Sequence, residues 1–238
     1  IEKFQSITGI DERKYVSGEV KSSDLAAIAA KKAIKDSNIN QETLDYIIVA
    51  HNFGDISCDS SQIDTLPSLS SRVKTILKIK NPKCVAYDII CGCPGWVEGV
   101  IQAKSFIKSG MANKCLVIGS DTLSRVTDDN DRDSMIYADG SGAIILESNN
   151  SDDSGILSHN SATYTFEGEN EFIYYGSSYN PKLSKDSNQK YIKMQGRKVY
   201  EFALTNVPAA MKDCFDQSNC KIENLKKIFI HQANKKMD

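Results

Sequence analysis

Residues 87–96 read Tyr-Asp-Ile-Ile-Cys-Gly-Cys-Pro-Gly-Trp, and they contain the strand-to-helix alternation on which the fold depends. The apolar run Cys84–Ile90 predicts a buried strand, since short apolar runs bounded by turn residues are typical of such strands. A tight turn that carries Cys93 follows the strand. Pro94 suits the first position of a helix, because its missing N–H costs nothing there. The helix is predicted at residues 97–109, directly before a glycine that can end it.

Cys93 precedes that proline and therefore lies at the predicted N-cap of the helix. Free backbone amides and the positive end of the helix dipole favour a thiolate over a thiol at such a position. An activated nucleophile needs this arrangement, although the same spacing also fits a buried capping cysteine without chemistry. Cys91 is the competing candidate, but it lies at the end of the predicted strand, where no helix dipole reaches it.

Similar runs lie on both sides of this stretch. Short apolar runs predict buried strands at 46–50, 114–119 and 143–147. Helices are predicted at 24–38, where Ser23 can cap the first turn, and at 67–77. Strands that alternate with helices predict a largely parallel α/β sheet.

The C-terminal third of the sequence is more mixed. The polar segment 149–154 predicts a linker or a turn into a second half, and 176–189 predicts a loop. A helix is predicted at 197–214, with a kink or a break at Pro208. The last predicted strand is Ile228–Ile230.

Composition excludes several classes of protein. The 238 residues suffice for one large domain or two modest ones, and 40% of them are apolar, enough for a core. A net charge of −2 argues against a dedicated nucleic-acid binder, and no apolar run is long enough for a membrane helix. Seven cysteines without a C-x-x-C pair predict reduced thiols and a cytoplasmic location. Of these, Cys84 and Cys115 are predicted to be buried, because they lie in apolar runs.

Two histidines directly follow predicted strands. His231 follows Ile228–Ile230, and a histidine there can project into a cleft, because ligand sites of open α/β sheets lie at the carboxyl ends of strands. His51 follows the strand at 46–50 in the same way, so the pattern does not separate the two. For either one, the alternative is a hydrogen-bonded structural histidine.

The segment 137–143, Tyr-Ala-Asp-Gly-Ser-Gly-Ala, contains a Gly-x-Gly pattern. A dinucleotide site is rejected, because the third glycine of that motif is missing and a strand rather than a helix follows. The segment instead predicts a tight turn close to the active site, with glycines where side chains do not fit.

Taken together, these segments resemble the β-ketoacyl-acyl-carrier-protein synthase III family of the thiolase superfamily. The resemblance runs nearly end to end, with the motifs in order. The residues that carry it are Thr8–Arg13, Ala86–Asp88 leading to Cys93–Trp96, Gly119–Asp121, Asp131 and Arg132 with Asp139–Ala143, and His231–Asn234. It implies a thiolase-like α/β fold of two related halves, with parallel-rich mixed sheets between helices. The expected halves are 1–150, which carries the cysteine, and 151–238, which carries the histidine.

The resemblance also implies a reaction, a decarboxylative Claisen condensation by an acyltransferase of fatty acid biosynthesis. Cys93 matches the nucleophile that takes an acyl group from acyl-CoA, and His231 matches the histidine that helps to stabilise the enolate left when malonyl-acyl carrier protein loses CO₂. Both acyl compounds are substrates, so no cofactor and no metal are expected. The family's catalytic asparagine is expected beyond Asp238, and the fold is expected to be incomplete at both ends, with the second half truncated.

Further matches concern the substrate. Leu66 aligns with the family's aromatic gatekeeper, which is donated across a homodimer, so a smaller residue there implies a longer acyl chain than acetyl. The other expected substrate-binding residues are Arg132, Ile136, Tyr137, Gly196 and Arg197. Lys236 matches a basic residue that docks acyl carrier protein. Lys3 and Ile7 stand where the family has a tryptophan and an arginine for CoA, a departure that weakens the expectation of CoA binding.

Two other interpretations stay open. One is a thiolase-fold condensing enzyme of secondary metabolism, such as one that makes aryl polyenes or quinolones. The other is a non-catalytic partner that binds carrier protein or pairs with an active paralogue, against which an intact Cys93 and His231 argue. A synthase of hydroxymethylglutaryl-CoA is a weaker option, because it needs a glutamate base that no segment supplies.

Overall fold

The structure of the chain, a computed structural model, describes residues 2–59, 62–149, 155–183 and 188–237. It forms two compact units. Unit 1 comprises Ile1–Arg13, Val126–Tyr137 and Gly155–Asp238, and unit 2 comprises Lys14–Arg125 and Ala138–Ser154. The units are therefore discontinuous in sequence, whereas the predicted halves, 1–150 and 151–238, are continuous.

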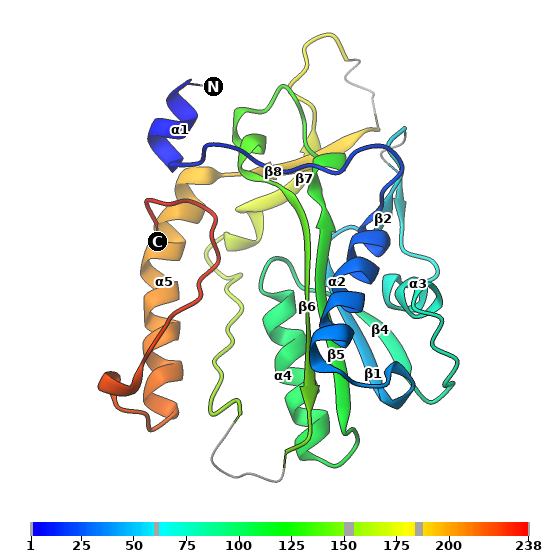
Figure 1. Ribbon diagram of the computed structural model, residues 1–238. Helices are drawn as coiled ribbons and strands as arrows, with labels where there is room; N and C mark the ends of the chain where they lie inside the picture. Colours follow the sequence, from blue (N-terminus) through cyan, green and yellow to red (C-terminus); the bar gives the residue numbers. More distant parts are fainter. Residues whose placement is uncertain (1, 60–61, 150–154, 184–187, 238) are drawn as a thin grey trace. The chain divides into compact units, whose positions relative to one another are not determined.

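Unit 2 is built on a four-stranded sheet in the order β4-β1-β5-β6 (Figure 1). Strand β1 (Tyr46–His51) pairs in parallel with β4 (Val85–Ile90) on one side and with β5 (Lys114–Thr122) on the other. Strand β6 (Asp139–Glu147) runs antiparallel to β5 at the edge. All four predicted strands of this half are confirmed, and the sheet is parallel apart from β6.

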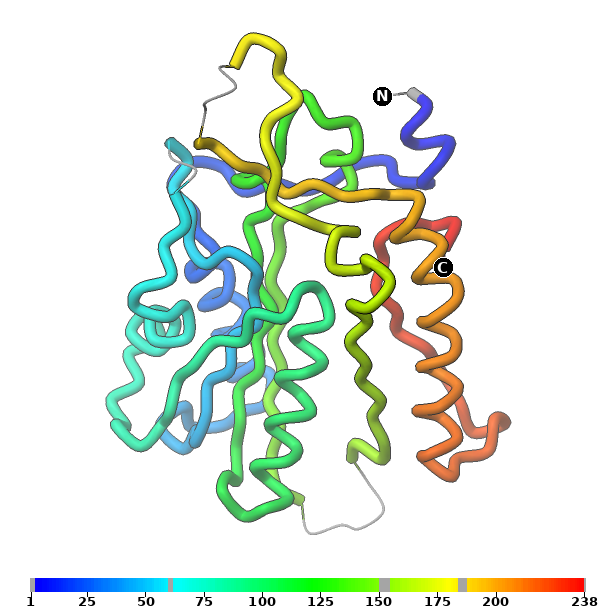
Figure 2. Tube along the Cα trace, turned by 180° about the vertical axis from the view of Figure 1, so that it is seen from behind, coloured from blue at the N-terminus to red at the C-terminus, as the bar shows by residue number. Residues whose placement is uncertain are grey.

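Helices cover both faces of this sheet, as Figures 1 and 2 show from opposite sides. Successive residues of a strand point to opposite faces. In β1, Ile47 and Val49 pack with α2 (Ser22–Ser37) and α3 (Leu69–Ile76), whereas Ile48 packs with α4 (Gly95–Lys108). The centre of the strand, Ile47–Ala50, is apolar because both of its faces are buried.

Two short strands and two short helices complete unit 2. The strands are β2 (Asp55–Ile56) and β3 (Ile63–Asp64), which pair antiparallel. The 3₁₀ helices are η1 (Gln41–Thr43) and η2 (Leu123–Arg125).

The start of α2 differs from the prediction, which placed Ser23 at the cap. The N-cap is Lys21, and Ser23 lies in the first turn, where its hydroxyl donates to Asp55 Oδ2 over 2.6 Å. The backbone N–H of Ser23 donates to Oδ1 of the same carboxylate over 2.8 Å. A carboxylate from β2 thus satisfies a free amide of the helix start, a contact that the local sequence does not contain.

The prediction of a tight glycine turn at 137–143 is wrong. Residues from Asp139 onward belong to β6, and the ladder with β5 continues to the pair Thr122–Asp139. A Cβ added to Gly140 or Gly142 would meet no heavy atom within 4 Å, so steric crowding does not explain these glycines.

The described part of unit 1 contains two helices, a pair of short strands and several 3₁₀ helices. Helix α1 (Glu2–Thr8) is N-terminal, strands β7 (Ile173–Ser177) and β8 (Lys190–Met194) form an antiparallel pair, and α5 (Gly196–Gln217) follows. The 3₁₀ helices are η3 (Arg132–Ile136), η4 (Glu169–Glu171) and η5 (Ile222–Asn224). Pro208 lies inside α5, which continues on both sides of it, so the predicted break is absent.

The strand predicted at Ile228–Ile230 is wrong. These residues have no regular structure, and their side chains are exposed. The segment that contains them runs back alongside α5 in both views (Figures 1 and 2). An apolar run becomes a strand only where another strand satisfies its backbone groups, and the described part of unit 1 has no sheet other than β7-β8.

Two other expectations concern loops and membranes. The predicted loop 176–189 includes the last two residues of β7 and stops directly before β8, with 184–187 outside the described residues. The predicted linker 149–154 also lies outside them except for Asn149. No helix in the described part of the chain has both the length and the apolar character needed to cross a membrane.

Candidate active site

Cys93 lies on the turn between β4 and α4. Gly92 has φ +65°, a left-handed conformation that glycine adopts without strain, and its carbonyl accepts from the Gly95 amide over 3.0 Å. The N-cap of α4 is Pro94, so Cys93 precedes the cap by one residue and the predicted N-cap position is wrong. Cys93 is a free, solvent-exposed cysteine, as is Cys91.

Two glycines allow this turn to pack closely on the sheet. A Cβ on Gly95 would lie 3.2 Å from Ala50 Cβ, near the end of β1. A Cβ on Gly119 of β5 would lie 3.2 Å from Cβ of Trp96. The cysteine turn therefore lies over the carboxyl ends of parallel strands, where open α/β sheets bind their ligands.

The electrostatic surroundings of Cys93 differ from the prediction. Although the residue as a whole is exposed, surrounding protein atoms partly desolvate its thiol and raise the pKa of Cys93, and the nearby carboxylate of Asp121 raises that pKa further. A hydrogen bond to its own backbone acts in the opposite direction without reversing the shift. The helix start was expected to favour the thiolate, whereas desolvation and a negative charge at this position favour the thiol.

Asp121 is a site residue that the sequence suggested only through the Gly119–Asp121 motif. It accepts two hydrogen bonds from Asn52, at 2.9 Å from the backbone N–H and at 2.6 Å from Nδ2. Burial raises the pKa of the Asp121 carboxyl despite these bonds. Asn52 was missed altogether, although its place directly after β1 is a signal that could have found it.

His51 is a structural histidine. It is buried, its Nε2 lies 2.9 Å from Asp88 Oδ2, and its Nδ1 accepts from the Gly54 amide over 3.0 Å. Asp88 also accepts from the backbone amides of Leu69 and Ser70 at the start of α3. Although burial works in the opposite direction, the hydrogen bonds from His51 and from α3 lower the pKa of Asp88. Both ring nitrogens of His51 thus have partners within the protein, which favours the hydrogen-bonded structural alternative for this histidine.

His231 belongs to unit 1 and is exposed. The three residues after it, Gln232–Asn234, meet the N-terminal segment, since Nη2 of Arg13 donates to the carbonyl of Ala233 over 3.1 Å. The Lys235 amide donates to the Thr8 carbonyl over 3.0 Å. Two motifs quoted for the resemblance, at opposite ends of the sequence, are therefore in contact.

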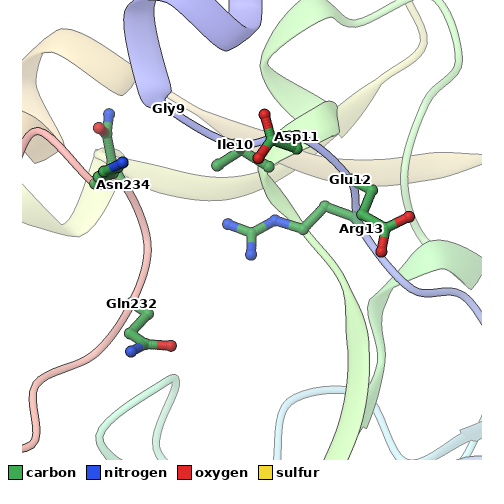
Figure 3. Close-up of a pocket in the computed structure, with 8 residues that line it drawn as sticks. Gly9, Ile10, Asp11, Glu12, Arg13, Gln232 and Asn234 are labelled. Atoms are coloured by element: carbon green, nitrogen blue, oxygen red, sulfur yellow. The ribbon is translucent and has the colours of Figure 1, made fainter.

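These segments line a cavity of about 320 Å³, which lies entirely within unit 1 (Figure 3). Its lining residues are Gly9, Ile10, Asp11, Glu12, Arg13, Gln232, Asn234 and Lys235. Figure 3 shows the Arg13 side chain extending toward the C-terminal segment. Gly9 has φ +69°, and a Cβ there would lie 2.7 Å from Lys235 Cβ, so this approach requires glycine.

Lys236, predicted to dock carrier protein, lies at the end of this contact. Its Nζ donates to the Ser6 carbonyl over 2.6 Å, and the residue remains exposed. The ammonium group is thus held at the surface of unit 1, next to the end of α1.

Five predicted substrate-binding residues lie in unit 1, around η3 and the start of α5. Arg132 begins η3 and is largely exposed, Ile136 ends it, and Tyr137 follows. Gly196 is the first residue of α5, and a Cβ there would lie 3.5 Å from Asp133 Oδ2. The structure thus brings the Arg132 turn next to Gly196. Arg197 points to solvent and pairs with Glu201 over 2.8 Å.

A buried lysine, missed by the sequence, holds the Arg132 turn. Lys193 of β8 is only 2% exposed, and its Nζ lies 2.6 Å from Asp128 and 3.2 Å from Asp131. The Tyr179 ring lies 3.8 Å from the same atom. Asp131 caps η3 by accepting from the Asp133 amide over 3.0 Å. The lysine therefore fixes the carboxylate on which the η3 start depends.

Leu66 belongs to unit 2, in the segment before α3. Its side chain is 85% exposed, and its role in an acyl pocket stays a prediction. Of the predicted site residues, Cys93 and Leu66 thus lie in unit 2 and all others in unit 1.

The sequence pattern of the 3-oxoacyl-[acyl-carrier-protein] synthase III family matches residues 87–165, which include Cys93. The β-ketoacyl-[acyl-carrier-protein] synthase III of Streptococcus gordonii is 34% identical over 234 residues, which cover 98% of this chain and 68% of that protein. The enzyme of the same name from Streptococcus pneumoniae is 35% identical over 236 residues, with the same coverage. The crystal structure of the Thermus thermophilus β-ketoacyl-[acyl-carrier-protein] synthase III superposes with a TM-score of 0.81 at 28% identity, covering 99% of this chain and 70% of that one.

Fold and site thus define a condensing enzyme of the thiolase-like α/β class, an acyltransferase. The chain belongs to the β-ketoacyl-acyl-carrier-protein synthase III family. The predicted family, fold class and enzyme class are confirmed.

Proposed function

We propose that this protein condenses an acyl-CoA with malonyl-acyl carrier protein through an acyl-Cys93 intermediate. The observation that carries the proposal is the place of Cys93, exposed on a glycine turn over the carboxyl ends of β1 and β5. Family membership supplies the reaction class. The alternative nucleophile, Cys91, precedes the turn and has no comparable position at the start of α4.

The proposed reaction has two steps. The Cys93 sulfur attacks the carbonyl carbon of the acyl-CoA thioester and forms a new thioester, while the bond to the CoA sulfur breaks and the proton of the Cys93 thiol passes to that sulfur, so CoA leaves as its thiol. The malonyl group then releases CO₂, and the resulting enolate carbon attacks the acyl-Cys93 carbonyl, which frees the cysteine sulfur and forms the 3-oxoacyl product. His231 is assigned the stabilisation of the enolate oxygen by hydrogen bonding.

The raised pKa of Cys93 bears on the first step. A neutral thiol is stable in the free protein, so the proton has to leave when substrate binds. Acyl-CoA and malonyl-acyl carrier protein are substrates in this scheme, and no resident cofactor takes part.

Binding roles follow the same scheme. Arg132, Ile136, Tyr137, Gly196 and Arg197 are proposed to contact the CoA and pantetheine portions of the substrates, and Lys236 the acidic carrier protein. The exposed Leu66 is proposed to line the acyl pocket of a second copy in a homodimer. A cytoplasmic location remains the expectation, in keeping with seven free cysteines.

The proposal is tested by incubating the protein with acyl-CoA and malonyl-acyl carrier protein and then measuring the mass of the carrier protein by mass spectrometry. The 3-oxoacyl form is expected with the native sequence and with Cys91→Ser, and is expected to be absent with Cys93→Ser. Equal loss of product in both variants would overturn the assignment of Cys93. Tight binding of carrier protein without product in the native sequence would instead support the non-catalytic partner.

A further inference from the structure

Arg72 of α3 makes an unusually complete set of contacts around the segment that carries Leu66. Its Nη2 donates to the Leu66 carbonyl over 2.9 Å, and its Nε donates to the Pro67 carbonyl over 3.0 Å. Nη1 and Nη2 pair with Asp55 and Asp64, each over 2.7 Å. The guanidinium thus uses all three of its nitrogens on one short stretch of chain.

The two carboxylates belong to the small β2-β3 pair, in which Asp55 lies directly opposite Asp64. Asp55 is buried and also accepts from the Ser23 amide and hydroxyl at the start of α2. Asp64 accepts from the Leu66 amide over 3.3 Å. The hydrogen bond from Arg72 lowers the pKa of Asp64, so the Asp64 carboxylate stays ionised at neutral pH.

These hydrogen bonds fix the backbone of Leu66, while its apolar side chain is exposed. Leu66 donates its amide to Asp64 and its carbonyl accepts from Arg72, while its side chain is 85% exposed. A loop with free carbonyls would sample many conformations, and the leucine would then offer no defined surface to a substrate.

We infer that Arg72 is a positioning residue for acyl-chain selection, fixing the backbone at Leu66 and Pro67 so that the Leu66 side chain sets the length of the acyl pocket. The inference rests on the proposed function, since it assigns Leu66 to that pocket. Only an arginine supplies the planar fork that reaches two carbonyls and two carboxylates together.

The test uses Arg72→Lys, which keeps a positive charge beside the buried Asp55 carboxylate but loses the fork. The rate of acyl-enzyme formation is measured with acyl-CoAs from acetyl to dodecanoyl. Arg72→Lys is expected to change the ratio of the decanoyl to the acetyl rate by about tenfold, in the same direction as Leu66→Ala. The double variant is expected to match Leu66→Ala alone, because Arg72 acts only through Leu66.

Lys74→Gln is the matched control, since Lys74 holds the carbonyls of Asn81 and Cys84 at the other end of α3 over 2.8 and 2.7 Å. It should reduce stability without changing the chain-length ratio. An unchanged ratio in Arg72→Lys, or an equal change in Lys74→Gln, would overturn the inference.

Amide hydrogen exchange needs no substrate, so it tests the positioning role of Arg72 independently of the proposed function. Arg72→Lys is expected to accelerate exchange in residues 64–68 by at least about tenfold, with α4 unchanged. Exchange that remains as slow as in the native sequence would overturn the inference whether or not the protein is acylated. If the native sequence forms no acyl-enzyme but Arg72→Lys accelerates exchange, the proposed function fails while the positioning of Leu66 by Arg72 stands.

Discussion

The side chain of Arg13 is hydrogen-bonded to the backbone of Ala233: its Nη2 donates to the Ala233 carbonyl over 3.1 Å, although the two residues are 220 positions apart in the sequence. The bond ties the N-terminal segment of unit 1 to the residues that directly follow His231. A second bond, from the Lys235 amide to the Thr8 carbonyl, acts in parallel with it. The backbone after an exposed histidine is thus fixed by residues from the opposite end of the chain, as a residue with a catalytic role would need.

His231→Ala is expected to leave acylation of Cys93 unchanged and to suppress release of CO₂ from malonyl-acyl carrier protein by at least about 100-fold. The reason is that the histidine is assigned only to the enolate, and general acid or base groups contribute on this scale. Acylation is followed by the mass of the protein, and decarboxylation by radiolabelled CO₂. Loss of acylation in this variant would show a different role for His231.

His51→Gln is the corresponding change at the other histidine. Its expected effect is a loss of about 1.5–3 kcal/mol in the free energy of unfolding, because a buried hydrogen bond to the Asp88 carboxylate is removed. Urea denaturation measures the loss. A variant as stable as the native sequence would contradict a structural role for His51.

Asp121→Asn is expected to lower the pKa of the Cys93 thiol, because it removes a nearby negative charge that disfavours the thiolate. The thiolate fraction at neutral pH then rises, and iodoacetamide should alkylate Cys93 faster at pH 7. At high pH both proteins should react at the same limiting rate. Both proteins carry Cys91→Ser, because Cys91 lies in the same peptide as Cys93, so that alkylation of that peptide reports Cys93 alone. A pH profile that does not move would exclude Asp121 as a cause.

Leu66→Phe is expected to shift acylation toward acetyl-CoA by about tenfold relative to decanoyl-CoA, since a larger side chain shortens the proposed pocket. Met111→Phe is the control, because Met111 is also exposed in unit 2 but lies after α4, away from this segment. The same preference in Leu66→Phe and the native sequence would remove Leu66 from the acyl pocket.

Lys193→Met is expected to destabilise unit 1 by about 3–5 kcal/mol, because it leaves two carboxylates, Asp128 and Asp131, buried beside an apolar side chain. The measurement is urea denaturation at pH 7. A loss below 1 kcal/mol would contradict the geometry of this cluster.

The same cluster predicts acid sensitivity. Although burial acts against it, the hydrogen bonds from Lys193 and from neighbouring amides lower the pKa of Asp128. The carboxylate therefore stabilises the folded protein at pH values above its unfolded pKa of about 4, and this contribution is lost as the pH falls below that value. Asp128→Asn should reduce the slope of stability against pH in that range.

The sheet of unit 2 could be predicted because its strands carry their own signal. Tyr46–His51 and Lys114–Thr122 are buried on both faces, so nearly every residue at their centres is apolar. Ile228–Ile230 carries the same signal without a neighbouring strand, and the pattern cannot report whether a partner exists. The opposite error occurred at Asp139–Ala143, where a turn was predicted instead of a strand. Its glycines and polar residues do not show the apolar pattern of a strand, although backbone pairing with β5 makes the segment one.

The residues of the site could be predicted from the sequence, but the contacts and charges that surround them could not. The cysteine turn and the motif after His231 can be found in the sequence, since each occupies a few consecutive positions. Desolvation and Asp121 set the charge state of Cys93, and both act through tertiary proximity. The same holds for Arg72 and Lys193, whose partners come from other elements, so neither side chain has a local pattern.

Acylation of Cys93 can be measured by intact-mass spectrometry after incubation with acyl-CoAs from acetyl to dodecanoyl. We expect a mass increase of one acyl group per chain, mapped to the peptide that contains Cys93 and lost in Cys93→Ser but kept in Cys91→Ser. The longest acyl group accepted also separates a starter enzyme from one for longer chains. An adduct on another residue, or none with any acyl-CoA or acyl carrier protein donor, would contradict the assignment of Cys93 as the nucleophile.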